Sequence, residues 1–356
     1  MTAEEAATEI RAQEAVRPRG GGTKLSWSPR TEAVDFDTRR LNRIIEHNEG
    51  DFTAILEAGV SLVEAQAMFA AAGQMLAIDP PLGAGDAATI GGVMATNDSG
   101  PLRHRYGTMR DLVVGVTVVL SDGTIAQSGG KVIKNVAGYD LAKLFTGSYG
   151  TLGLIVRVAV RLHPAPERTA TLSAESDDRA TLARAARTLA ALPLEADCLD
   201  VSWEGDAGRL DVRFGGTTAV ERAHEAQRHI ELGATIDEDD HELWARQRAR
   251  QRSEGTVVKV SGRPTDLEAV LSAAGGAGGT VVISRAALGI SYVADADVAA
   301  LREALAPRAC TVLDGADRAD DPWPTVDPGA LAVMERIKAR FDPAHTFRPG
   351  AFVGGL

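Results

Sequence analysis

Residues 16–24 of the chain read VRPRGGGTK and place three consecutive glycines between a basic residue and a threonine. Glycine lacks a side chain and accepts positive φ, so backbone N–H groups in such a loop approach an anion closely. The loop suits a phosphate, and an ordinary glycine-rich turn is the alternative that this motif alone leaves open. The neighbouring sequence therefore has to decide between the two interpretations.

A second glycine-rich stretch, residues 79–100, reads DPPLGAGDAATIGGVMATNDSG and supplies further backbone donors together with short hydroxyl side chains. Neither a Walker A loop nor a strict G-x-G-x-x-G fingerprint occurs in the chain. The Ala-ended variant at residues 83–88 follows two prolines, where the dinucleotide fingerprint needs a strand. Two glycine loops of this kind favour a pyrophosphate bound outside a Rossmann fold.

Hydrophobic patterning predicts short helices and strands around these loops. Ser61, with Glu64 three residues later, predicts a capping box at the start of one helix. Almost nothing is periodic between residues 78 and 107, which indicates a long ordered loop. The other expected elements are helices at 3–13, around 41–45 and at 61–72, strands at 33–36, 52–57, 113–120, 124–127 and 154–163, and a helix or turn at 140–145.

Residues 164–168 are the expected domain boundary, because a strand ends there at a proline and the pattern then changes. Two rounds of strand, helix and strand follow and predict a ferredoxin-like antiparallel sheet with helices on one face. The strands are expected at 170–174, 198–203, 209–214, 257–260, 280–293 and 310–313, and the helices at 179–192, 220–232, 267–273 and 297–305.

An acidic, proline-rich stretch at residues 316–328 is typical of a linker, and residues 329–340 predict an amphipathic helix. We therefore expect an α+β protein. Its first domain covers residues 1–165, a cap domain covers 166–328, and residues 329–356 form a helix and tail that return to the first domain.

The chain of 356 residues carries 49 acidic and 38 basic residues, a formal net charge of −11. This charge repels phosphate backbones and aromatic residues make up only 4%, so nucleic acid is not an expected partner. Cys198 and Cys310 are too few for a disulfide framework, a four-cysteine zinc site or an iron–sulfur cluster. No apolar run reaches the roughly 18 residues of a membrane span, and the N-terminus lacks a signal-peptide pattern, so we expect a cytoplasmic protein.

Taken in order, these motifs resemble the FAD-binding flavoenzymes of the vanillyl-alcohol oxidase and p-cresol methylhydroxylase (PCMH) type. They resemble more closely the FAD-binding subunits of bacterial glycolate oxidases. The matching segments are 18–24, 79–81, 91–100, 106–111, 130–155 and 341–350, whereas residues 166–330 match only in length and character. The resemblance implies a PCMH-type domain of two subdomains that hold FAD, joined to a cap domain.

The resemblance also implies roles for single residues. Members that tether the flavin through the first loop carry His just after the glycines, where this chain has Thr23, so FAD is expected to be non-covalent. Tyr139 and Asp140 are interpreted as a structural turn near the cofactor. The implied cofactor-binding residues are Pro18, Arg19, Gly20, Gly21, Gly22, Thr23, Lys24, Asp79, Pro80, Ala88, Thr89, Gly91, Gly92, Ala95, Thr96, Asn97, Ser99, Gly100, Tyr106, Gly107, Gly150, Thr151, Gly153 and Ile155, the last at the adenine end.

In this interpretation the glycines leave room for the phosphates. Valine at Gly21 or Gly91 is therefore expected to abolish flavin retention while leaving folding largely intact.

Oxidation of a hydroxy acid needs a group that takes the hydroxyl proton and a cation for the carboxylate. The related catalytic subunits carry a His-rich segment with a metal in the cap, and this chain has none. His224 and His229 are five residues apart and His241 adjoins Glu242, which favours solvated surface positions over a metal site. Arg285 is a candidate for the carboxylate, with an edge-strand charge as the equal alternative, and no base is assigned.

Two functional hypotheses remain. The first is an FAD-binding subunit of a glycolate oxidase complex, assembled with a larger FAD-containing catalytic subunit and an iron–sulfur subunit that accepts the electrons. Such partners would give the complex a peripheral position at the inner face of the membrane. The second is a self-sufficient FAD-dependent 2-hydroxy-acid dehydrogenase or oxidase. The missing His-rich segment and the short chain favour the first, and the intact glycine loops disfavour a scaffold that has lost flavin.

Overall fold

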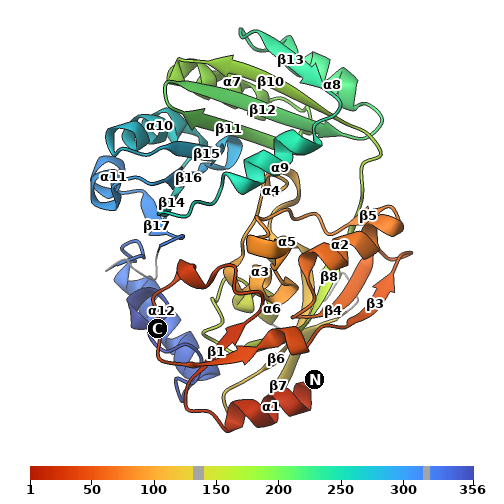
Figure 1. Ribbon diagram of the computed structural model, residues 1–356, viewed down its shortest axis with the longest axis vertical. Coiled ribbons are helices and arrows are strands. Elements are labelled where there is room, and N and C mark those ends of the chain that lie inside the picture. The colour runs from red at the N-terminus through yellow and green to blue at the C-terminus, as the bar shows by residue number, and fades with distance from the viewer. Residues whose placement is uncertain (131–139, 316–320) are drawn as a thin grey trace. The chain divides into compact units, whose positions relative to one another are not determined.

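The computed structural model describes residues 1–130, 140–315 and 321–356. They form two compact units, whose elements are labelled in Figure 1. The first unit comprises Met1–Ser99, Gly107–Ala165 and Thr325–Leu356, and the second comprises Gly100–Tyr106 and Pro166–Pro324. This division differs from the expected segments in two respects, because residues 100–106 group with the second unit and the first unit resumes at residue 325.

A five-stranded antiparallel sheet with the order β3-β4-β8-β6-β7 forms the centre of the first unit. Its middle strand β8 (Leu154–Arg161) reads LIVRVAVR and is buried along most of its length, as expected of a β-branched run with neighbours on both sides. The other strands are β3 (Ile44–Asn48), β4 (Thr53–Glu57), β6 (Val113–Val119) and β7 (Ile125–Gly129). The strands predicted at 52–57, 113–120, 124–127 and 154–163 are confirmed.

A small parallel pair of strands carries the first glycine loop. β1 (Val16–Arg19) pairs with β2 (Val34–Asp37), and Val16 also bridges to Phe347 near the C-terminus. The predicted N-terminal helix is present as α1 (Ala3–Arg11), and it buries Ala6, Ala7 and Ile10. The glycine loop therefore begins where β1 ends, beside a segment more than three hundred residues away in the sequence.

Short helices complete the first unit. They are α2 (Leu62–Ala71), α3 (Ile90–Thr96), α5 (Met109–Leu112), α6 (Leu141–Phe145) and α12 (Pro328–Phe341). The strands β5 (Gln74–Met75) and β9 (His163–Pro164) form a further two-stranded pair. The helices predicted at 61–72, 140–145 and 329–340 are confirmed.

Three expectations for this unit are wrong. The helix expected around residues 41–45 is strand β3, because two β-branched isoleucines begin a segment that pairs with β4. The loop expected at 78–107 contains α3. Ser61 is the N-cap of α2 but its side chain makes no capping hydrogen bond. The backbone N–H of Leu62 instead donates to the Ala88 carbonyl, so the start of the helix is satisfied by another segment.

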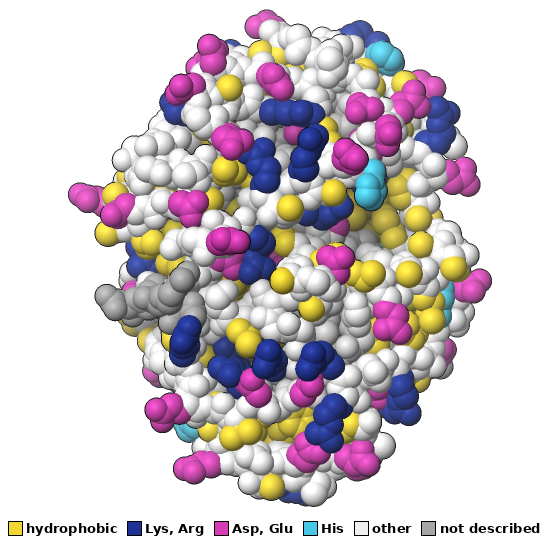
Figure 2. All heavy atoms as spheres, viewed as in Figure 1, with side chains coloured by type: hydrophobic (Ala, Val, Ile, Leu, Met, Phe, Trp, Pro, Cys, Tyr) yellow, Lys and Arg dark blue, Asp and Glu magenta, His cyan; other side chains and the backbone are white. Residues whose placement is uncertain are grey.

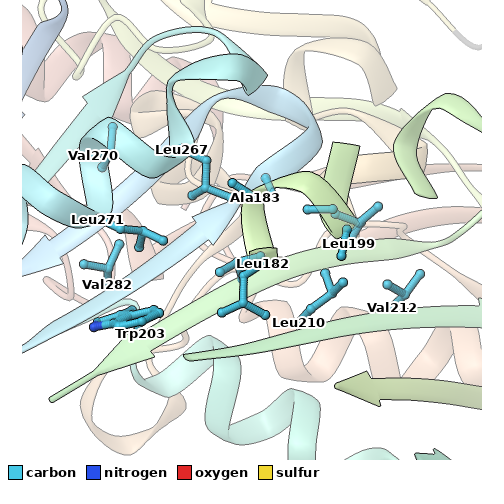
Figure 3. Packing of buried hydrophobic residues seen from close by; sticks show 14 of the residues in the cluster. Leu182, Ala183, Leu199, Trp203, Leu210, Val212, Leu267, Val270, Leu271 and Val282 are labelled. Carbon is cyan, nitrogen blue, oxygen red and sulfur yellow. The ribbon is translucent and has the colours of Figure 1, made fainter. Parts of the chain in front are cut away.

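The second unit is an eight-stranded antiparallel sheet with the order β13-β10-β12-β11-β15-β16-β14-β17. Helices pack on one face, where Leu182 and Leu271 meet strand residues such as Leu210 in a hydrophobic core (Figure 3). Its elements are β10 (Thr169–Ser176), α7 (Arg179–Ala191), β11 (Cys198–Glu204), β12 (Ala207–Gly215), α8 (Ala219–Gln227), β13 (Ala234–Asp237), β14 (Val257–Ser261), α10 (Leu267–Gly276), β15 (Val281–Arg285), β16 (Ile290–Ala294), α11 (Val298–Leu305) and β17 (Ala309–Val312).

The opposite face of this sheet is polar and carries α9 (His241–Ala249), which was not predicted. Trp244 donates from its indole N–H to the Thr171 hydroxyl at 2.8 Å, and Arg213 pairs with Asp240 at 3.1 Å. The sequence of α9, HELWARQRA, shows little hydrophobic periodicity because the sheet face beneath it is itself polar. The short helix α4 (Arg103–Tyr106) also contacts this unit, at β11.

Candidate cofactor-binding site

The first unit contains a cavity of about 700 Å³, including its open mouth. Sites for cofactors and drug-sized ligands have volumes of roughly 300–1,000 Å³. The main segments of its wall are the loop after β1, the first turns of α3, the turn leading into β8 and the C-terminal loop at Arg348, and Thr38 and Ala58 complete it. The sequence-predicted residues on the wall are Pro18, Arg19, Gly20, Gly21, Gly22, Thr23, Lys24, Thr89, Gly91, Gly92, Ala95, Thr96, Gly150, Gly153 and Ile155.

The glycine loop presents unused backbone donors to this cavity. Within the described part of the chain, no residue accepts a hydrogen bond from the N–H groups of Gly20, Gly21 or Gly22. Gly22 has a φ of 72°, the left-handed conformation that favours glycine. Successive free N–H groups around a left-handed residue form a nest for an anion. The nest interpretation of this loop is therefore favoured over the ordinary turn.

The loop also needs glycine because it packs tightly against a neighbouring segment. A Cβ atom at Gly21 would lie 1.7 Å from the carbonyl oxygen of Ala87, and one at Gly91 would lie 2.7 Å from the Cβ of Ala58. Side chains at both positions would collide with the protein itself. The expectation that valine there would only fill the space of the phosphates is therefore wrong, because both sites are filled by neighbouring chain.

Helix α3 forms part of the wall, but its first N–H groups are already used. The N–H of Gly91 donates to the Ala58 carbonyl at 2.7 Å. The N-cap residue Thr89 accepts from the N–H of Gly92 at 3.3 Å. The unused donors of the cavity therefore come from the glycine loop rather than from the start of α3.

Arg348 brings a buried guanidinium to the cavity wall. It donates to the Tyr149 carbonyl at 2.7 Å and to the Ser28 hydroxyl. No carboxylate of the described residues forms an ion pair with it, and its Nε has no hydrogen-bond partner among them. Burial lowers the pKa of Arg348 to about 10, so the group stays charged at neutral pH. A buried cation without a counterion favours an anionic ligand beside it.

The other two cations on the wall are already paired. Lys24 is buried and its Nζ lies 3.2 Å from Asp98 Oδ2, while Arg19 pairs with Asp35 at 3.1 Å. Arg348 therefore supplies the positive charge that the described acidic residues leave uncompensated.

Arg348 reaches the cavity because the preceding C-terminal loop is fixed by a buried ion pair. Asp342 accepts hydrogen bonds from the backbone N–H groups of Thr346 and Phe347 at 2.9 and 2.8 Å. Lys338 pairs with Asp342 at 2.8 Å and donates to the Phe347 carbonyl at 2.9 Å. The FDP motif at residues 341–343 thus has a structural role that orients the loop.

Several predicted residues lie off the cavity wall, and some wall residues were not predicted. Gly100 and Tyr106 belong to the second unit. Asp79, Pro80, Ala88, Asn97, Ser99, Gly107 and Thr151 belong to the first unit but do not line the cavity. The residues that were missed are Leu25, Thr38, Ala58, Val93, Tyr149, Leu154 and Arg348. A basic residue inside the C-terminal motif FRPG was the sequence signal for Arg348.

Of the turn expected at Tyr139 and Asp140, the structure describes only Asp140. Residues 131–139 of the matching segment lie outside the described residues, as do residues 316–320 of the expected linker. Asp140 precedes α6 and lies 3.4 Å from Lys143 in an exposed ion pair. Nothing in this arrangement gives Asp140 a proton-transfer role.

Arg285 lies in β15 between β11 and β16, so the edge-strand alternative is wrong. Its side chain is buried and pairs with Asp200. It also donates a hydrogen bond to the side-chain amide oxygen of Gln251. A substrate carboxylate would have to displace Asp200, so this environment does not favour the predicted role. Of the histidines, His229 lies 2.9 Å from Glu225 on the surface, and His241 begins α9.

Comparisons with known proteins include a family model that matches the N-terminal part of the chain. Residues 3–129 match the family model described as an FAD binding domain. The chain is 38% identical over 159 residues to the glycolate oxidase subunit GlcD of Bacillus subtilis, covering 44% of this chain and 33% of that protein. It is 34% identical over 181 residues to the glycolate oxidase subunit GlcE of Escherichia coli, covering 51% of each. A D-lactate dehydrogenase of Archaeoglobus fulgidus is 41% identical over 148 residues, covering 41% of this chain and 32% of that protein.

The chain thus spans between about a third and about half the length of these curated relatives. A solved structure of alkyldihydroxyacetonephosphate synthase aligns with a TM-score of 0.72 at 15% identity, covering 97% of this chain and 75% of that one. This likeness confirms the expected fold class. Among the described helices, none has the length and apolar character needed to cross a membrane.

Proposed function

We propose that this chain, whose residues 3–129 match the family model described as an FAD binding domain, holds FAD non-covalently in the cavity of its first unit and takes part in oxidising a small 2-hydroxy acid. When bound, FAD supplies a two-electron acceptor for the hydride that leaves the hydroxyl-bearing carbon. The N–H groups of Gly20, Gly21 and Gly22 would hold the pyrophosphate, and Arg348 would offset part of its negative charge. Thr23 occupies the position from which some related proteins tether the flavin.

The observation that carries this proposal is the coincidence of an unused donor nest and an uncompensated buried cation on one cavity wall. Binding of an anion would stabilise the site, because an unpaired buried charge and unsatisfied N–H groups are each unfavourable. A pyrophosphate satisfies both. The fit therefore rests on this chain's own residues as well as on the family match.

We further propose that the chain is a subunit of a glycolate oxidase complex, with a larger FAD-containing catalytic subunit and an iron–sulfur subunit as partners. The support is the likeness to the GlcE subunit of Escherichia coli. The aligned residues cover 51% of that protein. The absence from the sequence of a His-rich segment points the same way. The D-lactate dehydrogenase of Archaeoglobus fulgidus supports the second candidate, a self-sufficient 2-hydroxy-acid dehydrogenase.

A visible spectrum of the purified chain, followed by anaerobic addition of glycolate and D-lactate, tests both candidates. A yellow protein whose flavin bands bleach is a self-sufficient dehydrogenase. A yellow protein that does not bleach supports the subunit role, and co-purification with an iron–sulfur protein from its native cells then identifies the complex. A colourless chain that binds no added FAD would contradict both candidates.

A further inference from the structure

The outer side of helix α2 in the first unit is apolar. The helix reads LVEAQAMFAA, and its inner residues Leu62, Ala65 and Phe69 are buried. Val63 and Met68 remain 42% and 41% exposed. Figure 2 shows hydrophobic side chains gathered over this helix. The exposed residues of α2, which we call the α2 surface, are Val63, Glu64, Ala67, Met68, Ala70 and Ala71.

A surface helix normally carries charged and polar residues on its outer side. Helix α7 of the second unit does so, since it exposes Arg184 and Arg187. Helix α2 has two polar residues, and the amide of Gln66 is used within the unit, where it donates to two main-chain carbonyls at 2.7 and 3.1 Å. Glu64 is then the remaining polar side chain of α2. A helix that is apolar on all sides is typical of one covered on all sides, so the α2 surface has the character of an interaction site.

The surroundings of α2 are acidic. Residues 44–102 contain eight acidic residues and no lysine or arginine. Glu64 lies in the first turn of α2. Glu49 and Asp51 lie near its other end, because Gln74, just past the helix, donates to the Glu49 carbonyl at 2.8 Å. Neither Glu49 nor Glu64 forms an ion pair within the described part of the chain. The α2 surface therefore has an apolar centre between acidic ends.

The arginines of the neighbouring sheet do not cancel this charge. Arg157 and Arg161 share one face of β8, and Arg161 lies beside Thr53. Helix α2 packs on the opposite face, where the rings of Phe69 and His47 are 5.1 Å apart, since His47 and Thr53 belong to adjacent pairs of the ladder. Acidic ends repel a second copy of this chain and an anionic lipid surface. They attract a partner with basic side chains around apolar ones.

We propose that the α2 surface docks a different protein chain, whose contacting segment presents apolar side chains flanked by Lys or Arg. The three alanines allow close approach, and Val63 and Met68 supply the larger apolar contacts. Glu49 and Glu64 then pair with basic residues at the rim. The inference names the docking face of the proposed subunit and rests on that role for the existence of a partner. Every residue of α2 is described and none lines the cofactor cavity, so docking and flavin binding are measured separately.

Photocrosslinking of the full chain in its native cells tests the proposal. The photoreactive residue p-benzoylphenylalanine replaces Met68, where a large side chain already stands, and mass spectrometry identifies the adduct. We expect an adduct with a protein that also co-purifies with the parent chain, at an apolar segment flanked by Lys or Arg. The same probe at Thr188, exposed on α7, should give none. An adduct with a second copy, with a lipid or with a segment that lacks basic residues would overturn the proposal, as would no adduct.

Variants separate the apolar and the charged contributions. Met68→Glu is expected to lower the amount of co-purified partner at least about tenfold, because docking would bury an unpaired carboxylate. Glu64→Lys should lower it about three- to tenfold by repelling the basic rim, whereas an anionic membrane would bind this variant more tightly. Thr188→Glu places the same new residue on an exposed helix of the second unit and should match the parent.

All three substitutions are at exposed positions, so each variant should unfold at the parental temperature. An unchanged amount of partner with Met68→Glu would overturn the docking face. The visible spectrum of the same preparations reports on flavin alone. A colourless chain that loses its partner only in the α2 variants would contradict the proposed cofactor and leave the docking face standing.

Discussion

The Lys338 ammonium and the Asp342 carboxylate lie 2.8 Å apart in the interior of the first unit, and both side chains are buried. Lys338 also donates to the carbonyl of Thr151 at 2.7 Å, on the segment that leads into β8. Asp342 holds the backbone N–H of Phe347 at 2.8 Å. The pair therefore ties the C-terminal loop to the cavity segment and sets the position of Arg348.

Asp342→Ala is expected to lower the free energy of unfolding by about 3–5 kcal/mol, because it leaves the Lys338 charge buried without its partner. Urea denaturation followed by circular dichroism measures this loss. The purified variant should also retain less FAD, because the loop that carries Arg348 loses its order.

Arg39→Ala is the control for an ion pair to an aspartate in solvent. Arg39 and Asp37 are 2.8 Å apart with side chains 63% and 42% exposed. Such a pair contributes about 0–1 kcal/mol. If Asp342→Ala destabilised the chain no more than Arg39→Ala does, the structural role of the buried pair would be refuted.

Arg348→Gln is expected to weaken FAD binding about 10- to 100-fold, because a hydrogen bond to a charged group contributes about 1.5–3 kcal/mol. Fluorescence titration of the apoprotein measures the dissociation constant. ADP should lose affinity in parallel, since it carries the same pyrophosphate, whereas riboflavin, which has no phosphate, should be unaffected.

Two comparisons separate this charge effect from a change of structure. Arg348→Lys keeps the charge and should retain much of the FAD affinity. Arg40→Gln removes a surface arginine paired with Glu9 and should change nothing. Parental FAD affinity in Arg348→Gln, with parental unfolding behaviour, would contradict the role of Arg348.

Gly21→Ala is expected to destabilise the chain as a whole and to lose flavin as a consequence. Its Cβ would meet the Ala87 carbonyl oxygen at 1.7 Å, a backbone atom that does not move without moving the loop. Thermal unfolding should show a clear fall in midpoint. Gly276→Ala, at the end of α10 with no atom within 4 Å of the new Cβ, should be neutral or stabilising by up to about 1 kcal/mol. A stable Gly21→Ala chain that only lost FAD would restore the simpler view that glycine leaves room for the phosphates.

The sequence predicted the elements and site residues that depend on local pattern. β8 and α1 follow from their apolar runs, and the glycine loop at 20–22 follows from composition alone. It failed where distant partners decide the structure. β3 is a strand because β4 lies beside it, and α9 is a helix that packs on a polar face.

The same distinction holds for the cavity. Gly20 and Thr89 were found because each lies in a conspicuous loop. Arg348 was missed because its position depends on a buried ion pair and on contacts with residues about two and three hundred positions away. Arg285 was misjudged because only the strand order shows that β15 is internal and that Asp200 is its partner.

His104 makes stability depend on pH just below neutrality. Its pKa lies below the usual 6.5, mainly because burial disfavours the charged ring and further because Arg105 is adjacent. At pH values between 6.5 and the lower pKa of the folded chain, the His104 ring binds a proton in the unfolded chain but not in the folded one. The contribution of the neutral ring to stability is therefore complete above about pH 6.5 and is lost as the pH drops through this window. His104→Gln should flatten that part of the curve of unfolding free energy against pH, measured by urea denaturation from about pH 8 to pH 5. His229→Gln, which replaces an exposed histidine by the same residue, is the control for the substitution itself. Parallel curves for the parent and His104→Gln would show that the ring gains its proton equally well in the folded chain.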